Sequence, residues 1–231
     1  RFGVMPKQAF PEETIEQIAD YLFEYDIDQP EWFEDHFNEE MGKEKGKGKV
    51  KGKGKGMQHG KKQASIVDKD LSYEELGLKY ALGTKTELGK NLMGKIQKEG
   101  TKAAITFCND KAYTLTDSMA KIYNATIKRV SDKPRNTHNN ANSKELGYIK
   151  KYKAIVSKRE ESKPISEVID DKVHVYYPIV TNTMCLQCHG KPKTDIDEIN
   201  YKKIKDLYPE DMAVGYNENE VRGMWHITFT K

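Results

Sequence analysis

Hydrophobic side chains recur at helical intervals in three stretches of the chain. Between residues 72 and 99 these side chains are Leu78, Leu82, Leu92 and Ile96. Between residues 101 and 112 they are Ala104, Ile105, Cys108 and Ala112. The third stretch follows a polar loop at 132–142, has Ser143 as its expected cap, and carries on one face Leu146, Ile149, Tyr152 and Ile155. This spacing predicts three helices, although four glycines in the first stretch each weaken that prediction by about 1 kcal/mol relative to alanine.

Strand patterns occupy the spaces between these helices and the end of the chain. Residues 173–180 are mostly β-branched and aromatic, and residues 125–131 form a shorter segment of the same kind. Residues 212–216 are expected to pair with 222–230 across a turn at 217–219. Because helices come first and antiparallel strands follow, the pattern predicts an α+β domain over residues 71–231.

The pattern changes ahead of residue 71. Residues 42–56 alternate lysine and glycine, so they offer no apolar face and their charges repel one another. We expect a flexible linker over residues 31–70. Before the linker, Ile15, Ile18, Ala19 and Leu22 predict one amphipathic helix, which cannot bury its apolar stripe alone.

Composition and charge narrow the function classes. The chain has 231 residues, of which 36% are hydrophobic and 32% charged, and a mean hydropathy of -0.84. It therefore supports one ordinary core, and no apolar run reaches the roughly 20 residues of a membrane span. The net charge of +3 combines -10 over residues 1–41 with +8 over residues 42–62. Since the densest positive charge lies in the linker and not on a folded face, we expect no nucleic-acid partner.

The linker itself has two interpretations. It is either a solvated spacer, which we favour, or an electrostatic tether to an acidic partner or an anionic surface. The chain begins at Arg1 without an initiator methionine, a charged leader or an apolar leader segment. We therefore expect it to be a processed or partial form of a longer protein.

The strongest chemical motif is Cys185-Leu186-Gln187-Cys188-His189. Two thiols at this spacing can each form a thioether to one edge of a haem, and the adjacent histidine then reaches the iron. A zinc site is also compatible with the motif, but it needs a fourth ligand, which Cys108 would have to supply. A thioredoxin-like redox pair would require a βαβ unit, and a structural disulfide would close a very small loop.

The surroundings of this motif resemble a bacterial c-type haem domain family with a PAS-like fold. The resemblance rests on residues 176–179 with 185–190, on an Arg/Asn loop at 129–139, and on a terminal hairpin at 214–223. It spans residues 71–231 and departs at Thr137, where the family usually has proline, and at Asn219, where it usually has glycine. The implied fold is a PAS-like antiparallel sheet with N-terminal helices and one covalently bound haem. Family members occur as free cytochromes and as sensory regions of signalling proteins.

The resemblance also implies site residues. It makes His189 the proximal iron ligand and Cys108 the ligand on the other side, and it assigns the haem propionates to Arg129, Arg135 and Asn136. Guanidinium groups suit this role because they bind carboxylates in a forked geometry. Further candidates for the second axial ligand are His226, His174, Met93 and Met119. The remaining histidines, which we expect to be solvated, are His36, His59 and His138.

Residues 1–25 carry a second resemblance. Gly3-Val4-Met5-Pro6 and the helix after it are similar to the C-terminal end of a class I cytochrome c. This implies that residues 1–30 are the remnant of such a domain. Met5 would be a ligand to a second haem, whose attachment motif would lie upstream of the chain.

Two functions follow as expectations. The first is electron transfer outside the cytoplasm by a c-type cytochrome with a redox partner protein; the second is a haem-based redox or gas sensor. A periplasmic or otherwise extracytoplasmic location follows from the family resemblance. The motifs that mark catalysis elsewhere, such as a phosphate-binding glycine loop or a nucleophile with its base, are not present, so we expect no enzyme.

Overall fold

A computed structural model describes residues 71–230. The expected N-terminal helix, the Gly/Lys linker, Met5, His36 and His59 lie outside the described residues. The structure therefore concerns only the domain that the sequence places at 71–231.

Two long helices open this domain. Helix α3 (Tyr73–Glu99) begins at a capping box, in which Ser72 and Glu75 each bond to the other's backbone N–H. Gly100, with φ +83°, ends α3 and lets helix α4 (Thr101–Tyr123) fold back against it. Both predicted helices are confirmed, and α4 continues past the predicted end to Tyr123.

Four antiparallel strands form one sheet in the order β1-β4-β3-β2. The strands are β1 (Thr126–Val130), β2 (Ile165–Ile169), β3 (Lys172–Val180) and β4 (Val221–Thr230). The predicted strands at 125–131, 173–180 and 222–230 are confirmed. The predicted strand at 212–216 is wrong, because β4 pairs with β1 and β3 and residues 212–216 run beside the cysteine motif instead.

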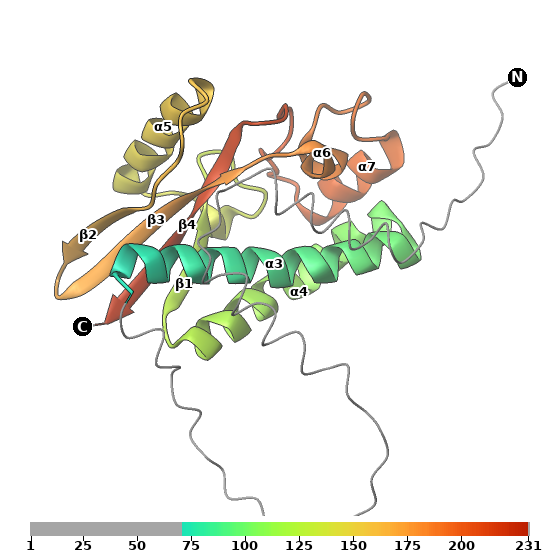
Figure 1. The fold of residues 1–231 in the computed structure, drawn as a ribbon. Coiled ribbons are helices and arrows are strands. Elements are labelled where there is room, and N and C mark those ends of the chain that lie inside the picture. The colour runs from blue at the N-terminus through green and yellow to red at the C-terminus, as the bar shows by residue number, and fades with distance from the viewer. Residues whose placement is uncertain (1–70, 231) are drawn as a thin grey trace, which may run out of the picture. The chain divides into compact units, whose positions relative to one another are not determined.

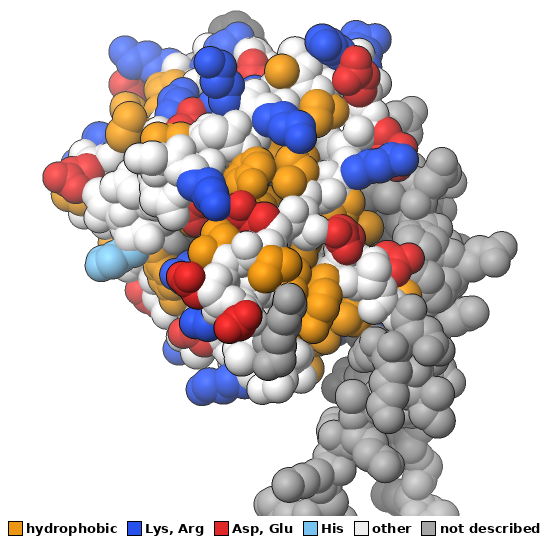
Figure 2. Space-filling view, turned by 90° about the vertical axis from the view of Figure 1, so that its left-hand side faces the viewer, with side chains coloured by type: hydrophobic (Ala, Val, Ile, Leu, Met, Phe, Trp, Pro, Cys, Tyr) orange, Lys and Arg blue, Asp and Glu red, His pale blue; other side chains and the backbone are white. Residues whose placement is uncertain are grey.

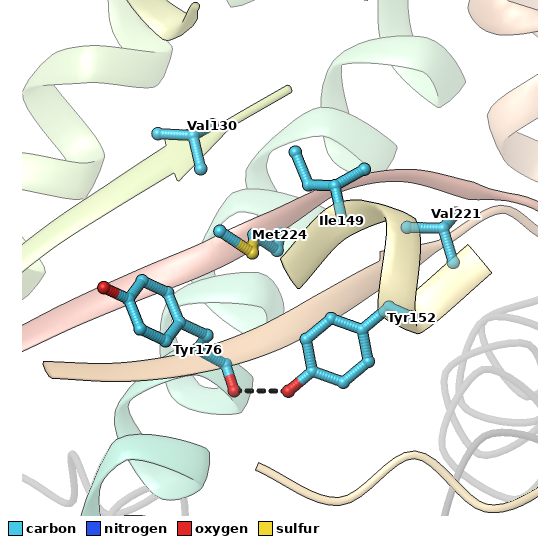
Figure 3. Packing of buried hydrophobic residues seen from close by; sticks show 6 residues of the cluster. All are labelled: Val130, Ile149, Tyr152, Tyr176, Val221 and Met224. Carbon is cyan, nitrogen blue, oxygen red and sulfur yellow. Dashed lines mark hydrogen bonds between the residues drawn. The ribbon is translucent and has the colours of Figure 1, made fainter. Parts of the chain in front are cut away.

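Two helices cover opposite faces of the sheet (Figure 1). On one side, α3 packs so closely on β3 that a Cβ added to Gly77 would lie 2.4 Å from Cγ1 of Val175. On the other side lies helix α5 (Ser143–Ser157). Its Tyr152 is fully buried and donates a 2.7 Å hydrogen bond to the backbone oxygen of Tyr176 within the cluster shown in Figure 3. The α+β class is thus confirmed.

Helix α5 begins one residue earlier than expected. Its cap is Asn142, whose side chain accepts a bond from the Glu145 backbone while Glu145 bonds back to the Asn142 N–H. Ser143 is therefore the first helical residue and not the cap. A capping box needs Glu or Gln three residues after the cap. Glu145 stands three residues after Asn142, which makes Asn142 and not Ser143 the cap.

Residues 181–220 form a closed excursion between the adjacent strands β3 and β4. Thr181 N–H donates to Glu220 O at 2.9 Å, and Asn219 N–H donates to Thr181 O at 2.8 Å, which joins the two ends. Asn219 has φ +58°, a conformation that asparagine tolerates better than most residues. The excursion holds helices α6 (Thr183–His189) and α7 (Glu198–Leu207), which lie together at one end of the sheet (Figure 1).

The surface is not uniformly polar. Figure 2 shows a face on which hydrophobic side chains are exposed between lysine, arginine and acidic side chains. In the described part of the chain, the large hydrophobic side chains left exposed are Tyr73, Tyr113, Ile122, Leu146, Val168, Ile199 and Met212. No helix within residues 71–230 combines the length and the hydropathy that a bilayer crossing requires.

Candidate functional site

The cysteine motif lies on the short helix α6. Cys185 and Cys188 are one turn apart, so both thiols project from the same side of the helix. Asn182 caps this helix: its side-chain oxygen accepts from the Cys185 backbone N–H and from the Cys185 thiol, both at 3.2 Å. Neither cysteine forms a disulfide, and both are half-buried. The helix therefore presents two thiols together at one edge.

His189 follows on the same helix with its ring orientation fixed. Its Nδ1 lies 2.8 Å from the backbone oxygen of Ala213, and since a carbonyl can only accept, Nδ1 carries the proton. Burial, together with the positive charges of Arg222 and Arg135, holds the pKa of His189 well below its usual value. The ring is thus neutral with an unprotonated Nε2, the form in which histidine binds a metal.

Residues 211–216 hold the end of the motif in place. Tyr216 N–H donates to His189 O at 3.0 Å, and Gly215 N–H donates to Gly190 O at 2.8 Å. A Cβ added to Gly190 would lie 2.5 Å from Cβ of Asp195, so this close passage needs glycine. The segment predicted as a strand is therefore the backbone clamp of the motif.

Arg135 connects residues 211–216, the backbone clamp, to the cysteine motif by hydrogen bonds to both. Its guanidinium donates to the Asp211 carboxylate at 3.1 Å, to Cys188 O at 2.5 Å and to Ala213 O at 3.2 Å. The side chain of Asp211 is 0% exposed and that of Arg135 only 11%. Ala213 O thus accepts from both Arg135 and His189. Arg135, predicted as a propionate donor, is occupied by protein partners.

Arg222 is a site residue that the sequence analysis did not select. Ile179 of β3 pairs with Gly223 and Val180 with Val221, so Arg222 is the extra residue of a β-bulge in β4. Such bulges redirect side chains. The Nε of Arg222 is enclosed and has no hydrogen-bond partner. Burial, with the positive charges of Arg135 and Arg129, lowers the pKa of Arg222 to about 10.

Arg129, on β1, belongs to the same positive group. Burial lowers its pKa, opposed by the charges of Cys108, Tyr113 and Tyr208. Only five of the 39 lysine and arginine residues in the chain are arginine, and three of those five gather here. That scarcity is a signal by which Arg222 could have been found.

Cys108 is half-buried on α4, between the buried Ala104 and Ala112. Burial raises the pKa of its thiol more than Arg129, Arg135 and Arg222 lower it. Burial likewise raises the pKa of Cys188 to about 11, and Cys108 is among the groups that act on it. The structure thus brings Cys108 into the electrostatic neighbourhood of the motif and the arginines.

The remaining predicted candidates have different surroundings. The Asn136 side-chain oxygen accepts from the His138 backbone N–H at 3.0 Å and caps the 3-10 turn Thr137–Asn139. The Nδ1 of His226 lies 2.8 Å from Oε1 of Glu145, and its Nε2 lies 2.8 Å from Nδ1 of His174. Both ring nitrogens of His226 thus have hydrogen-bond partners outside the cysteine motif. His138 is exposed, as expected. Met93 and Met119 are half-buried on α3 and α4, where nothing marks either as a ligand.

The zinc and thioredoxin-like interpretations of the motif find little support in the geometry. Within residues 71–230, no three His, Cys, Asp or Glu side chains converge as a metal ion would require, so Cys108 does not complete a zinc site with the motif. The motif does open a helix after strand β3, but β3 and β4 are antiparallel, so the βαβ unit of a thioredoxin-like site is not formed.

The fold and the site define an α+β domain in which a later segment holds the end of a CxxCH helix and three half-buried arginines lie nearby. The chain belongs to the Tll0287-like family, whose model matches residues 8–230. A solved structure, described as the cyanobacterial heme-protein Tll0287, shares this fold with a TM-score of 0.50 and 20% sequence identity. The likeness covers 70% of this chain and 98% of that one. No curated protein matches the chain.

The family match includes part of the segment assigned to a class I cytochrome c remnant. That resemblance, the division of residues 1–70 and the PAS-like character of the sheet stay predictions.

Proposed function

We propose that this protein is a c-type cytochrome that carries one haem, bound covalently through Cys185 and Cys188 with His189 as an axial iron ligand, and that it transfers electrons outside the cytoplasm. One observation carries the proposal: the helix that presents both thiols also presents a neutral imidazole whose Nδ1 proton is held by Ala213 O. The shared fold with a protein described as a heme-protein supports it.

The residues around the motif suit the group that they would hold. Each thiol would add across one vinyl group of the haem, with sulfur bonding to one carbon and the proton passing to the other. When bound, the haem supplies an iron that gains and loses one electron. Cys108 would be a second protein ligand to the iron. The enclosed, unpartnered Nε of Arg222 marks a place for an acceptor that the described residues do not provide.

The chain's own residues would fix the axial histidine. Ala213 O holds the imidazole in one tautomer, Arg135 holds Ala213 O and the Cys188 backbone, and Asp211 holds Arg135. Such outer partners control the orientation and basicity of a metal-bound histidine. With both His189 and Cys108 as ligands, the iron would have no position left for a substrate, which favours electron transfer over catalysis. A redox partner protein and a periplasmic or other extracytoplasmic location belong to the same proposal.

The test is to express the full chain together with a haem c maturation system and to measure intact mass after denaturation. We expect a mass increase of one haem and a pyridine haemochrome spectrum of a two-thioether haem. Changing both Cys185 and Cys188 to serine should abolish the mass increase, whereas Cys108→Ser, the matched control, should retain it. A colourless wild-type protein would overturn the proposal, and tight CO binding to the reduced protein would replace electron transfer by gas sensing.

A further inference from the structure

Three arginines with a single carboxylate partner gather beside the motif. The Asp211 carboxylate is bound by Arg135. No described residue forms an ion pair with Arg129 or Arg222. The other groups that act on Arg222 are Tyr216, whose pKa is raised by burial, and the Cys185 thiol. The positive charges of Arg129 and Arg222 are thus poorly solvated and have no anionic partner among the described residues. This arrangement destabilises the fold unless a ligand supplies the negative charge.

The backbone brings these two arginines to the same end of the sheet. Val130 on β1 pairs with Met224 on β4, and Ser131 Oγ donates to Arg222 O at 2.6 Å. Arg129 and Arg222 therefore lie on adjacent strands, close to where β1 ends and β4 begins. The bulge at Arg222 frees its side chain from the regular alternation of β4.

We infer that Arg222 and Arg129 bind the two haem propionates, and that Arg135 does not take this role but positions the motif. This inference rests on the proposed function. The charges match, because two propionates carry two negative charges and these two guanidiniums are the uncompensated ones. The chemistry also matches, since the free Nε of Arg222 and the terminal nitrogens of a guanidinium form the fork that binds a carboxylate at two points.

The experiment compares haem-loaded wild-type protein with Arg222→Gln, Arg222→Lys and Arg159→Gln. Arg159 is exposed and lies in the loop after α5, so it is the matched control for loss of an arginine. Resonance Raman spectroscopy reports hydrogen bonding to the propionates through their bending modes, and a redox titration at fixed pH and salt gives the midpoint potential. Circular dichroism establishes that each variant is folded.

We expect Arg222→Gln to lower the propionate bending frequency and the midpoint potential, because removal of a positive charge favours the ferric state. Arg222→Lys should restore most of the potential but not the Raman frequency, since lysine replaces the charge and not the fork. Arg159→Gln should change neither. Folded, haem-loaded Arg222→Gln and Arg222→Lys proteins with wild-type Raman spectra would overturn the inference while leaving the proposed function intact. A wild-type chain that takes up no covalent haem would overturn both.

Discussion

Replacing Arg135 by methionine should destabilise the domain far more than a surface ion pair would. The change removes the guanidinium from the fully buried Asp211 carboxylate and from two backbone oxygens, Cys188 O and Ala213 O. Removal of one partner of a buried ion pair typically costs about 3–5 kcal/mol, because the other charge is left without compensation. The Asp211 carboxylate would keep only its 2.9 Å bond from the Ala213 N–H. We therefore expect the free energy of unfolding of Arg135→Met to fall by about 3–5 kcal/mol.

The chain contains its own control for this measurement. Lys144 and Glu167 form an ion pair of 2.7 Å, but the Lys144 side chain is 52% exposed. Lys144→Met should cost less than about 1 kcal/mol, the usual range for exposed pairs. Urea unfolding of the haem-free protein, followed by circular dichroism, measures both variants without any contribution from the cofactor.

A double-mutant cycle separates the pair from the rest of the arginine's contacts. Arg135→Met combined with Asp211→Asn should cost clearly less than the sum of the two single changes, because no unpaired charge remains buried. If Arg135→Met costs no more than Lys144→Met, the arginine does not brace the clamp, and its role as a positioning residue is refuted.

Three further outcomes are expected. Cys108→Ala should retain covalent haem but change the ferric spectrum and raise the midpoint potential, since a thiolate ligand stabilises ferric iron; an unchanged spectrum and potential would make Cys108 a packing residue. Gly77→Ala should lower the free energy of unfolding by about 1–3 kcal/mol, because the added methyl would collide with Val175, whereas Gly89→Ala, with open space around it, should not. Burial and the neighbouring His226 lower the pKa of His174 from its usual 6.5. As the pH drops below 6.5, the unfolded state binds a proton on His174 before the folded state does, so the free energy of unfolding should fall. Urea midpoints measured at successive pH values should fall less steeply in His174→Gln than in the wild type.

The sequence predicted the parts of the fold that depend on local signals. Helix α3 begins where Ser72 and Glu75 form a capping box, and the β-branched run of β3 is a strand with nearly the expected bounds. Strand β2 was missed because it is a half-exposed edge strand, in which Val168 is 59% exposed and no clear alternation marks a buried face.

In the site, too, the sequence predicted the residues that belong to a local motif and missed those placed by contacts between distant segments. Cys185, Cys188 and His189 carry a local motif, so sequence alone locates them. Residues 212–216 are short and mostly apolar, as many strands are, yet their backbone bonds to the end of α6 and not to β4. A short apolar pattern does not specify which backbone it bonds to. Arg222 depends on a bulge that arises from the pairing of β3 with β4, a relation between distant residues that no local pattern records.

The closed excursion at residues 181–220 has a consequence for how the protein matures. Because β3 and β4 are neighbours in the sheet and hydrogen bonds at Thr181 join the two ends of the excursion, a local opening of its helices would leave the strand register unchanged. If the proposed covalent haem is present, Cys185 and Cys188 could accept it while the sheet is already folded. The bonds from Gly215 N–H to Gly190 O and from Tyr216 N–H to His189 O could then form after attachment.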